Sequence, residues 1–448
     1  MAAQSLNITR TIDDRKVSPY QWSIIGVCAA VASMDGFDAQ AIGYVGPTLI
    51  KQWSLTGPVF GLAVSIGLVG LMLGALFIAP LADRFGRRPL IILSTALFGV
   101  FTLATAFAQN VDQLMVLRFL TGLGLGGCMP NAISLTSEYS PAKNRAFLVM
   151  VMFNGFTLGS LVGGLIAARL VPTLGWQAVF VVGGILPLLL VPVFWAAVPE
   201  SLRYLVTSKA PGAKVAAILK RIDPAIDAGP ETDYAVAEAH AKRMSVAQLF
   251  TDGRARRTIL LWVVFFMSLL DVYMLVNWMP ALMRSVGAPP TMSILFGVML
   301  QLGGFVGSFP LGWLLDRYGA RATMAPAYIL GAAAIAGIGY FATLDLQVTM
   351  AIVFIAGFGI IGGQTAANAV AAESYPTEVR STGVGWALGI GRAGSIVGPM
   401  IAGVLVGMKV TPQMILYISA VPALIGALAA IGLGKPVQRV TAGDVALH

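Results

Sequence analysis

The chain has 448 residues, of which 57% are hydrophobic and 11% are charged, and its formal net charge is +9. A soluble domain usually carries about 25% charged residues, so this composition excludes a soluble domain and indicates a membrane protein with many spans. The two cysteines, Cys28 and Cys128, lie in apolar segments and offer neither a disulfide framework nor a metal-site spacing.

Twelve apolar segments follow a polar N-terminal tail (1–19). Spans are expected at 20–47, 57–81, 90–108, 112–138, 145–170, 176–198, 257–283, 291–315, 322–343, 346–372, 381–407 and 411–434. Helices satisfy their own backbone hydrogen bonds in lipid, so the predicted fold class is an all-α membrane protein with twelve transmembrane helices in two pseudo-symmetric six-helix bundles. The first span is too long for a signal-peptide core, and we expect it to be retained.

The distribution of Lys and Arg predicts the orientation. If the N-terminus is cytoplasmic, 23 of the 29 basic residues lie in inner loops and tails. The outer side then contains only Lys51, Arg169, Arg284 and Lys409. Basic residues accumulate on the cytoplasmic side, so we expect both termini inside the cell, with the chain in a cell membrane such as the bacterial inner membrane. This explains the positive charge without a nucleic-acid partner.

The two halves of the chain share sequence elements. The segment 81–88 returns as 314–321, and 138–145 returns as 373–380. Such repeats are typical of a transporter whose site lies between two related halves near the membrane midplane. The expected domains are, in order, a cytoplasmic tail (1–19), a six-helix bundle (20–198), a cytoplasmic linker (199–256), a second six-helix bundle (257–434) and a cytoplasmic tail (435–448).

The first of these repeats reads Asp83-Arg84-Phe-Gly86-Arg87-Arg88. It resembles the signature loop of the major facilitator superfamily, Gly-x-x-x-Asp-Arg-x-Gly-Arg-Arg, and the resemblance covers the whole twelve-span plan. The chain departs from the pattern at Ala79 in the first copy and at Ala320 in the second. The resemblance implies the major facilitator fold and does not identify a substrate.

The charges of these loops are interpreted as a gate latch. Asp83 can face the positive end of a helix, and the arginines can bridge carboxylates such as Glu138. The alternative is that the charges only anchor the topology. The candidate gating residues are Asp83, Arg84, Arg87, Arg88, Glu138, Arg145, Asp316, Arg317, Arg321, Glu373 and Arg380.

Two aspartates, Asp35 and Asp38, interrupt the first apolar span. A carboxylate at membrane depth costs about 2.5–3.5 kcal/mol and is a functional candidate by default, and the i, i+3 spacing places both on one helix face. Burial favours the neutral acid, so we expect proton coupling here. Together with Gly43 and Pro47, the pair resembles the first-helix signature of the aromatic acid:proton symporter family, where it is associated with activity. The alternative is that one aspartate caps a break at Gly36 or pairs with an arginine.

Two arginines, Arg118 and Arg392, lie within apolar spans. A guanidinium suits a carboxylate in bidentate fashion, so Arg118 is expected to pair with Asp35 or Asp38, and Arg392 is the best candidate for a substrate carboxylate. Asp271 is interpreted as a further proton-coupling site or as the partner of Arg392. The alternatives for both arginines are a structural ion pair or a side chain that reaches the interface.

Polar and aromatic residues of the spans could stack on a benzene ring and bond a ring hydroxyl, although many such side chains simply pack. The candidate substrate-binding residues are Arg392, Arg118, Phe37, Asn154, Tyr273, Asn277, Trp278, Gln301, Gln364, Asn368 and Trp386.

These features favour a proton-coupled symporter that imports a small aromatic carboxylate, such as a benzoate or hydroxybenzoate, by alternating access. The alternatives are a carrier of another organic acid, a sugar or a drug, and a sensor built on the same fold. The sequence shows no nucleophile–base constellation, metal cluster or nucleotide motif, so an enzyme is not expected. The expected partners are the substrate, protons and the lipid bilayer, with no cofactor and a monomer as the functional form.

Overall fold

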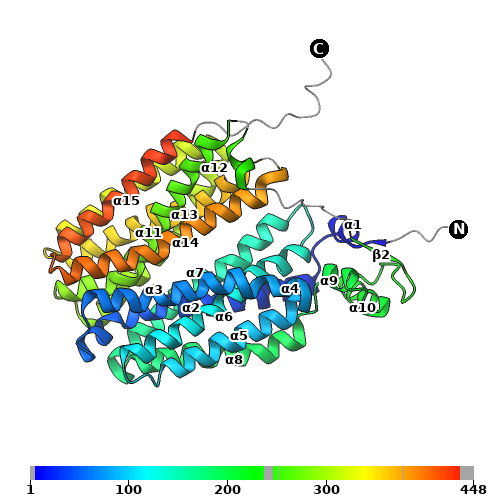
Figure 1. Ribbon diagram of the computed structural model, residues 1–448, viewed down its shortest axis with the longest axis horizontal. Helices are drawn as coiled ribbons and strands as arrows, with labels where there is room; N and C mark the ends of the chain where they lie inside the picture. Colours follow the sequence, from blue (N-terminus) through cyan, green and yellow to red (C-terminus); the bar gives the residue numbers. More distant parts are fainter. Residues whose placement is uncertain (1–5, 237–245, 252, 376, 434–448) are drawn as a thin grey trace, which may run out of the picture. The chain divides into compact units, whose positions relative to one another are not determined.

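The computed structural model describes residues 6–236, 246–251, 253–375 and 377–433, which form two compact units (Figure 1). The first unit comprises Met1–Ala239, Asn277–Arg284 and Ala288–Val298, and the second comprises His240–Val276, Ser285–Gly287 and Met299–His448. The predicted tail 435–448 and the side chain of Arg380 lie outside the described residues. The division into bundles at 20–198 and 257–434 stays a prediction.

The first unit is built from long helices. They are α2 (Pro19–Gln52), α3 (Gly57–Leu73), α5 (Arg87–Thr105), α6 (Val111–Glu138), α7 (Arg145–Leu174) and α8 (Gln177–Ala197). A π-helical turn (Gly74–Ile78), a 3₁₀ turn (Ala79–Leu81) and the short α4 (Ala82–Phe85) extend α3. Helix α2 packs on α7, while α6 packs on α3 and α5. The long helices of this unit lie side by side in Figure 1.

The start of α2 is fixed by its sequence. Ser18 accepts a hydrogen bond from the backbone of Gln21, and the Gln21 side chain accepts one from the backbone of Ser18, which is a capping box. Pro19 occupies the first helical position, where its missing N–H would have no partner within the helix. The helix therefore starts close to the predicted residue 20.

Two glycines bring α2 against α7. A Cβ at Gly36 would lie 1.9 Å from the carbonyl oxygen of Phe156, and a Cβ at Gly159 would lie 1.8 Å from that of Ser33. Only glycine permits this approach of two backbones, as in other helix pairs in membranes. Because Gly36 lies between Asp35 and Asp38, the contact also fixes the part of α2 that carries both carboxyl groups.

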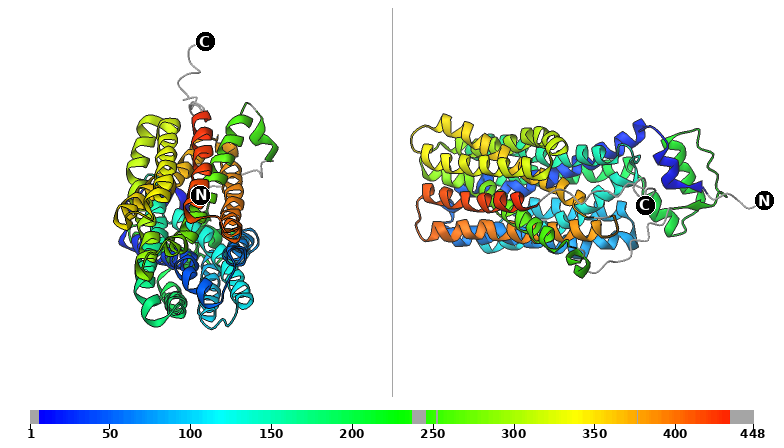
Figure 2. Two further views of the ribbon diagram at one scale, coloured as in Figure 1. Left: turned by 90° about the vertical axis from the view of Figure 1, so that its left-hand side faces the viewer. Right: turned by 90° about the horizontal axis from the view of Figure 1, so that it is seen from above.

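The second unit contains the rest of the long helices. They are α11 (Ala255–Ser285, up to Val276 in this unit), α12 (Pro290–Phe341, from Met299), α13 (Leu346–Glu373), α14 (Thr377–Gly407) and α15 (Pro412–Gly432). A 3₁₀ turn, Val246–Phe250, precedes α11. Figure 2 shows α14 in orange beside α15 in red, and the two helices are in contact.

The two spans predicted at 291–315 and 322–343 both fall within α12. Gly319 has φ 81° and breaks the helix there, which places the break inside the predicted loop. Among the described residues, nine helices are long and apolar enough to cross a membrane, and α2 and α6 are not among them. This finding agrees with a multi-pass membrane protein, whereas the count of twelve spans stays a prediction.

The N-terminal segment and the linker form a small structure together. Strand β1 (Leu6–Asn7) pairs in parallel with β2 (Tyr234–Ala235), and α1 (Ile8–Asp13) follows β1. The linker adds α9 (Leu202–Thr207) and α10 (Gly212–Ile222). Ile8 and Ile12 share one buried apolar cluster with Leu219. Burial of this apolar surface holds the tail on the linker.

Candidate functional site

Asp38 of α2 and Arg118 of α6 form a buried bidentate ion pair. The two guanidinium nitrogens Nη1 and Nη2 lie 3.1 Å from Oδ2 and Oδ1 respectively, and the side chains are 2% and 5% exposed. Thr102 donates a hydrogen bond of 2.6 Å to Oδ1, and Thr121 accepts one of 2.9 Å from Nη2. The guanidinium also lies over the ring of Phe180, 5.0 Å from its centroid. Of the two partners expected for Arg118, the structure shows Asp38.

The buried Arg118 guanidinium depends on the negative charge of Asp38. Removing two charges from water costs several kcal/mol per ion, which a pair repays only with good geometry and further hydrogen bonds. Asp38 and Arg118 have both. Neutralising Asp38 would therefore leave a buried cation without an anion, and the site would have to rearrange or take another anion.

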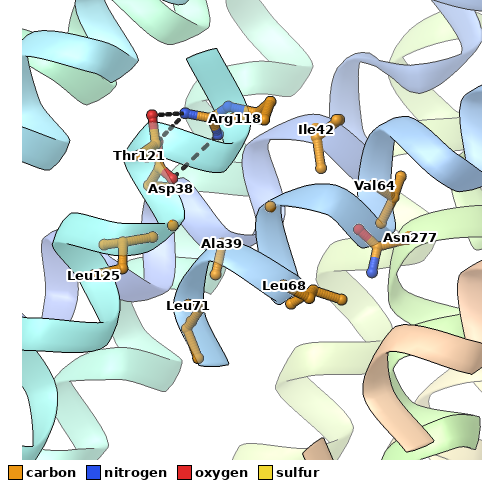
Figure 3. Close-up of a pocket in the computed structure, with 12 residues that line it drawn as sticks. Asp38, Ala39, Ile42, Val64, Leu68, Leu71, Arg118, Thr121, Leu125 and Asn277 are labelled. Carbon is orange, nitrogen blue, oxygen red and sulfur yellow. Dashed lines mark hydrogen bonds and ion pairs between the residues drawn. The ribbon is translucent and has the colours of Figure 1, made fainter. Parts of the chain in front are cut away.

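A cavity of about 40 Å³ lies beside the pair, and its walls include Asp38, Arg118, Thr121 and Asn277. Figure 3 shows Asp38, Arg118 and Thr121 at one side of it and Asn277 at the other. A space of this size holds water but not an aromatic ring, since benzene occupies a cavity of about 150 Å³. In this structure, Asp38 thus borders a space that water can enter.

Asp35 lies one helical turn before Asp38 and is 4% exposed. It is not among the residues that line the cavity of about 40 Å³. The two carboxyl groups on one face of α2 consequently have different surroundings, and Asp38 is joined to Arg118.

In the second unit, Arg392 of α14 donates a hydrogen bond of 3.1 Å from Nη1 to the hydroxyl of Tyr273 on α11. The same two helices carry Trp386 and Trp262, whose rings stack with centroids 5.8 Å apart. Arg392 is half-buried, and Trp386 is 43% exposed. No carboxylate of the described residues pairs with Arg392, so the structure does not show the alternative in which Asp271 is its partner.

Asp271 is the most completely buried of the three candidate proton-coupling residues. Its side chain is 0% exposed, and neither carboxyl oxygen has a hydrogen-bond partner among the described residues. Tyr328 is near enough to interact with it electrostatically. A buried ionised carboxylate without a donor is very costly. This position therefore suits a carboxyl group that carries its proton.

The signature loop of the first half is held by two glutamates. Arg87 Nη1 lies 2.7 Å from Glu138 Oε1, and Glu200 Oε1 accepts hydrogen bonds from the backbone of Arg87 (2.9 Å) and Arg88 (3.1 Å). A carboxylate at these backbone groups is favourable because they open helix α5. Gly86 has φ 96°, and a Cβ there would lie 2.3 Å from Glu200 Oε2. The positive φ favours glycine at this position of the motif.

The other candidate gating residues are more open. Asp83 and Arg84 are exposed, and so are Asp316, Arg317, Arg321 and Glu373. Arg145 binds Asp13 of the N-terminal segment, with 2.8 Å between Nη2 and Oδ1. Arg88 lies over the ring of Trp195, 5.0 Å from its centroid.

The remaining candidate binding residues lie in different environments. Trp278 is 1% exposed and packs edge-on against Phe60. Gln364 donates a 3.3 Å hydrogen bond to Asn368. Phe37 and Gln301 are buried, and Asn154 is half-buried. Arg392 and Tyr273 are therefore in contact, and so are Arg118 and Asp38. Among the described residues, no single pocket contains the whole predicted set.

Several partners of the site were not predicted. Thr102 contacts Asp38, Thr121 and Phe180 contact Arg118, and Glu200 contacts the signature loop. Threonine and phenylalanine are common in apolar helices, so neither had a signal of its own. Glu200 did have one, because a carboxylate directly after a span can cap a neighbouring helix.

Comparisons with known proteins identify the family of the chain. The sequence profile described as "Sugar (and other) transporter" matches residues 20–407. The 4-hydroxybenzoate transporter PcaK of Pseudomonas putida is 39% identical over 432 residues, covering 96% of this chain and 95% of that protein. The gallate transporter of the same organism is 38% identical and covers 97% of both, and the benzoate transport protein of Acinetobacter baylyi is 33% identical and covers 95% and 92%.

A solved structure shares the fold. It is that of a bacterial homologue of the human lysosomal transporter Spinster in an inward-facing and occupied conformation, with a TM-score of 0.69, 18% identity and coverage of 93% of this chain and 95% of that one. At this identity the likeness shows the fold alone. On the match of the profile and of these relatives, the chain belongs to the major facilitator superfamily, in the family of sugar and other transporters, and is a transporter and not an enzyme.

Proposed function

We propose that this protein is a proton-coupled symporter that imports a small aromatic carboxylate of the benzoate and hydroxybenzoate class. The observation that carries the proposal is the buried pair of Asp38 and Arg118 beside a cavity large enough for water. Relatives that match nearly the whole chain, the 4-hydroxybenzoate, gallate and benzoate transporters, support the class of substrate.

The proton acts through charge. A carboxylate that enters a negative-inside cell works against about 2.3 kcal/mol per 100 mV of membrane potential. One co-transported proton cancels this term, and a second makes entry favourable. Asp38 can take a proton from the water-sized cavity and release Arg118, while Asp35 and Asp271 are further buried carboxyl groups that can carry one.

The substrate carboxylate is assigned to Arg392. Its guanidinium is half-buried, donates to the neutral hydroxyl of Tyr273, and has further N–H groups for the two oxygens of a carboxylate. Trp386 on the same helix offers a partly exposed ring for the aromatic part. Sugar transport would not require this arginine, and neither would drug export.

The signature loops are proposed to gate the site. Arg87 with Glu138, and Glu200 with the start of α5, hold the loop after α4 in a fixed shape, and Arg145 joins the N-terminal segment to α7. The excess of basic residues in these loops supports an orientation with both termini in the cytoplasm. We propose a monomer in the bacterial inner membrane, with two six-helix bundles related by the repeat.

Uptake into proteoliposomes tests the proposal. Labelled 4-hydroxybenzoate should accumulate when the outside is more acidic than the inside, and a protonophore should abolish the accumulation. Benzoate and gallate should compete with the label, whereas glucose should not. Competition by glucose alone would favour a sugar carrier, and accumulation that survives the protonophore undiminished would exclude proton coupling.

A further inference from the structure

A second cavity, which we call the outer cavity, lies at the end of α2 in the first unit. It has a volume of about 210 Å³, and its walls include Thr48, Lys51, Pro172, Arg284 and Ser293. At 1.5 Å per residue, Lys51 lies about 20 Å along α2 from Asp38. The outer cavity is therefore separate from the cavity of about 40 Å³ beside Asp38.

The outer cavity is positively charged. Among the described residues that line it, Lys51 and Arg284 are the charged ones, and none is acidic. No carboxylate among the described residues forms an ion pair with either of them. Arg284 Nη1 donates a 2.7 Å hydrogen bond to the carbonyl of Ala288, which positions the guanidinium and leaves its other N–H groups for a ligand. The cavity is thus suited to an anion.

The walls between these charges are mostly apolar. Pro47, Pro172 and Pro290 line the cavity together with the ring of Tyr44, and such surfaces pack against an aromatic ring. Since a dry cavity of about 150 Å³ holds benzene, this one has room for a ring with a carboxyl group.

We propose that the outer cavity is a capture site for the aromatic carboxylate, which binds there before it reaches Arg392. The proposal rests on the proposed function, and on the sequence-based orientation that places Lys51 and Arg284 on the outer side. Clefts lined by one sign of charge concentrate the opposite ion and speed its association. Lys51 and Arg284 bind the carboxylate, and the prolines bind the ring.

The first test is uptake by the double variant Lys51→Gln with Arg284→Gln. At low salt its half-saturating concentration for 4-hydroxybenzoate should rise about tenfold, with the maximal rate close to that of the wild type. At high salt the difference should shrink, because exposed charges are screened. The matched control is Arg169→Gln with Lys409→Gln, which removes the same charge from two exposed residues that do not line the cavity.

A second test measures occupancy of the cavity and uses a variant whose charges are intact. Cys28 and Cys128 are buried, whereas Thr48 lines the cavity and is half-buried, so the cysteine of a Thr48→Cys variant is open to an impermeant maleimide. Benzoate should slow its labelling, and benzamide, which is neutral, should do so far less. The protection should persist in an Arg392→Gln background, which lacks the carboxylate site proposed at Arg392.

The results separate the two proposals. Wild-type protein that does not transport aromatic acids would overturn the proposed function. Wild-type transport together with a double variant that matches its control would overturn the capture site. Labelling of Thr48→Cys that benzoate does not slow, or slows only when Arg392 is present, would also overturn it.

Discussion

Arg118 binds both carboxylate oxygens of Asp38 at 3.1 Å, although the two residues are separated by 80 positions in the chain. The pair joins α2 to α6 inside the first unit. It therefore couples the charge state of one carboxyl group to the packing of two helices.

Replacing Asp38 by Asn should abolish proton-driven uptake and destabilise the protein. The variant buries the Arg118 charge without its anion, a change that costs about 3–5 kcal/mol in other proteins. Thermal unfolding in detergent and uptake in proteoliposomes measure the two effects. The double variant Asp38→Asn with Arg118→Gln should recover much of the stability but none of the uptake, so wild-type uptake by either variant would contradict the account.

Replacing Tyr273 by Phe should weaken substrate binding moderately. The variant loses the hydrogen bond that orients Arg392, and one such bond contributes about 1 kcal/mol, which corresponds to about a fivefold rise in the half-saturating concentration. Arg392→Gln should abolish uptake of benzoates. A carrier that still imports benzoate normally after Arg392→Gln would bind the carboxylate elsewhere.

Replacing Gly36 by Ala should lower the stability of the first unit by about 1–3 kcal/mol, the usual range for overpacking. The added methyl group would meet the carbonyl oxygen of Phe156 on α7. Gly26→Ala on the same helix is the matched control, because nothing lies within 4 Å of a Cβ there. Equal melting temperatures of the two variants would show that α2 and α7 do not pack so closely.

The attachment of the N-terminal segment should weaken at acid pH. The backbone N–H of Ala225 and then the side chain of Arg15 lower the pKa of Asp223 below its ordinary 3.8. A lowered pKa in the folded state contributes stability above the ordinary value, which is lost as the pH falls through the folded-state pKa. We expect the protection factors of the α1 amides, which compare their exchange with that of unprotected amides at the same pH, to fall below about pH 4.

The control for this pH effect is Asp223→Asn. It should show faster exchange in α1 already at neutral pH and a smaller acid response, because the Arg15 contact of 2.7 Å loses its charge. An identical acid response in the variant would assign the effect to another group, such as Asp13, which binds Arg145.

Much of the fold could be predicted because each span is an apolar segment with local end signals, as Ser18 and Pro19 show for α2. The break at Gly319 was also predictable from the loop motif. For the site, the sequence predicted which types of residue take part but not which residues pair with one another. Arg118 needed an anion, but its pairing with Asp38 depends on how α2 and α6 are placed in the folded unit. Thr102 and Phe180 complete the site through tertiary packing, which no local pattern records.

The most direct test measures protons and substrate together. Proteoliposomes that contain an internal pH dye are exposed to benzoate at a fixed membrane potential, and the uptake of label is followed in parallel. Our account predicts that wild-type protein acidifies the interior as substrate enters and that Asp38→Asn does neither. Entry of benzoate at the wild-type rate without proton movement would contradict it.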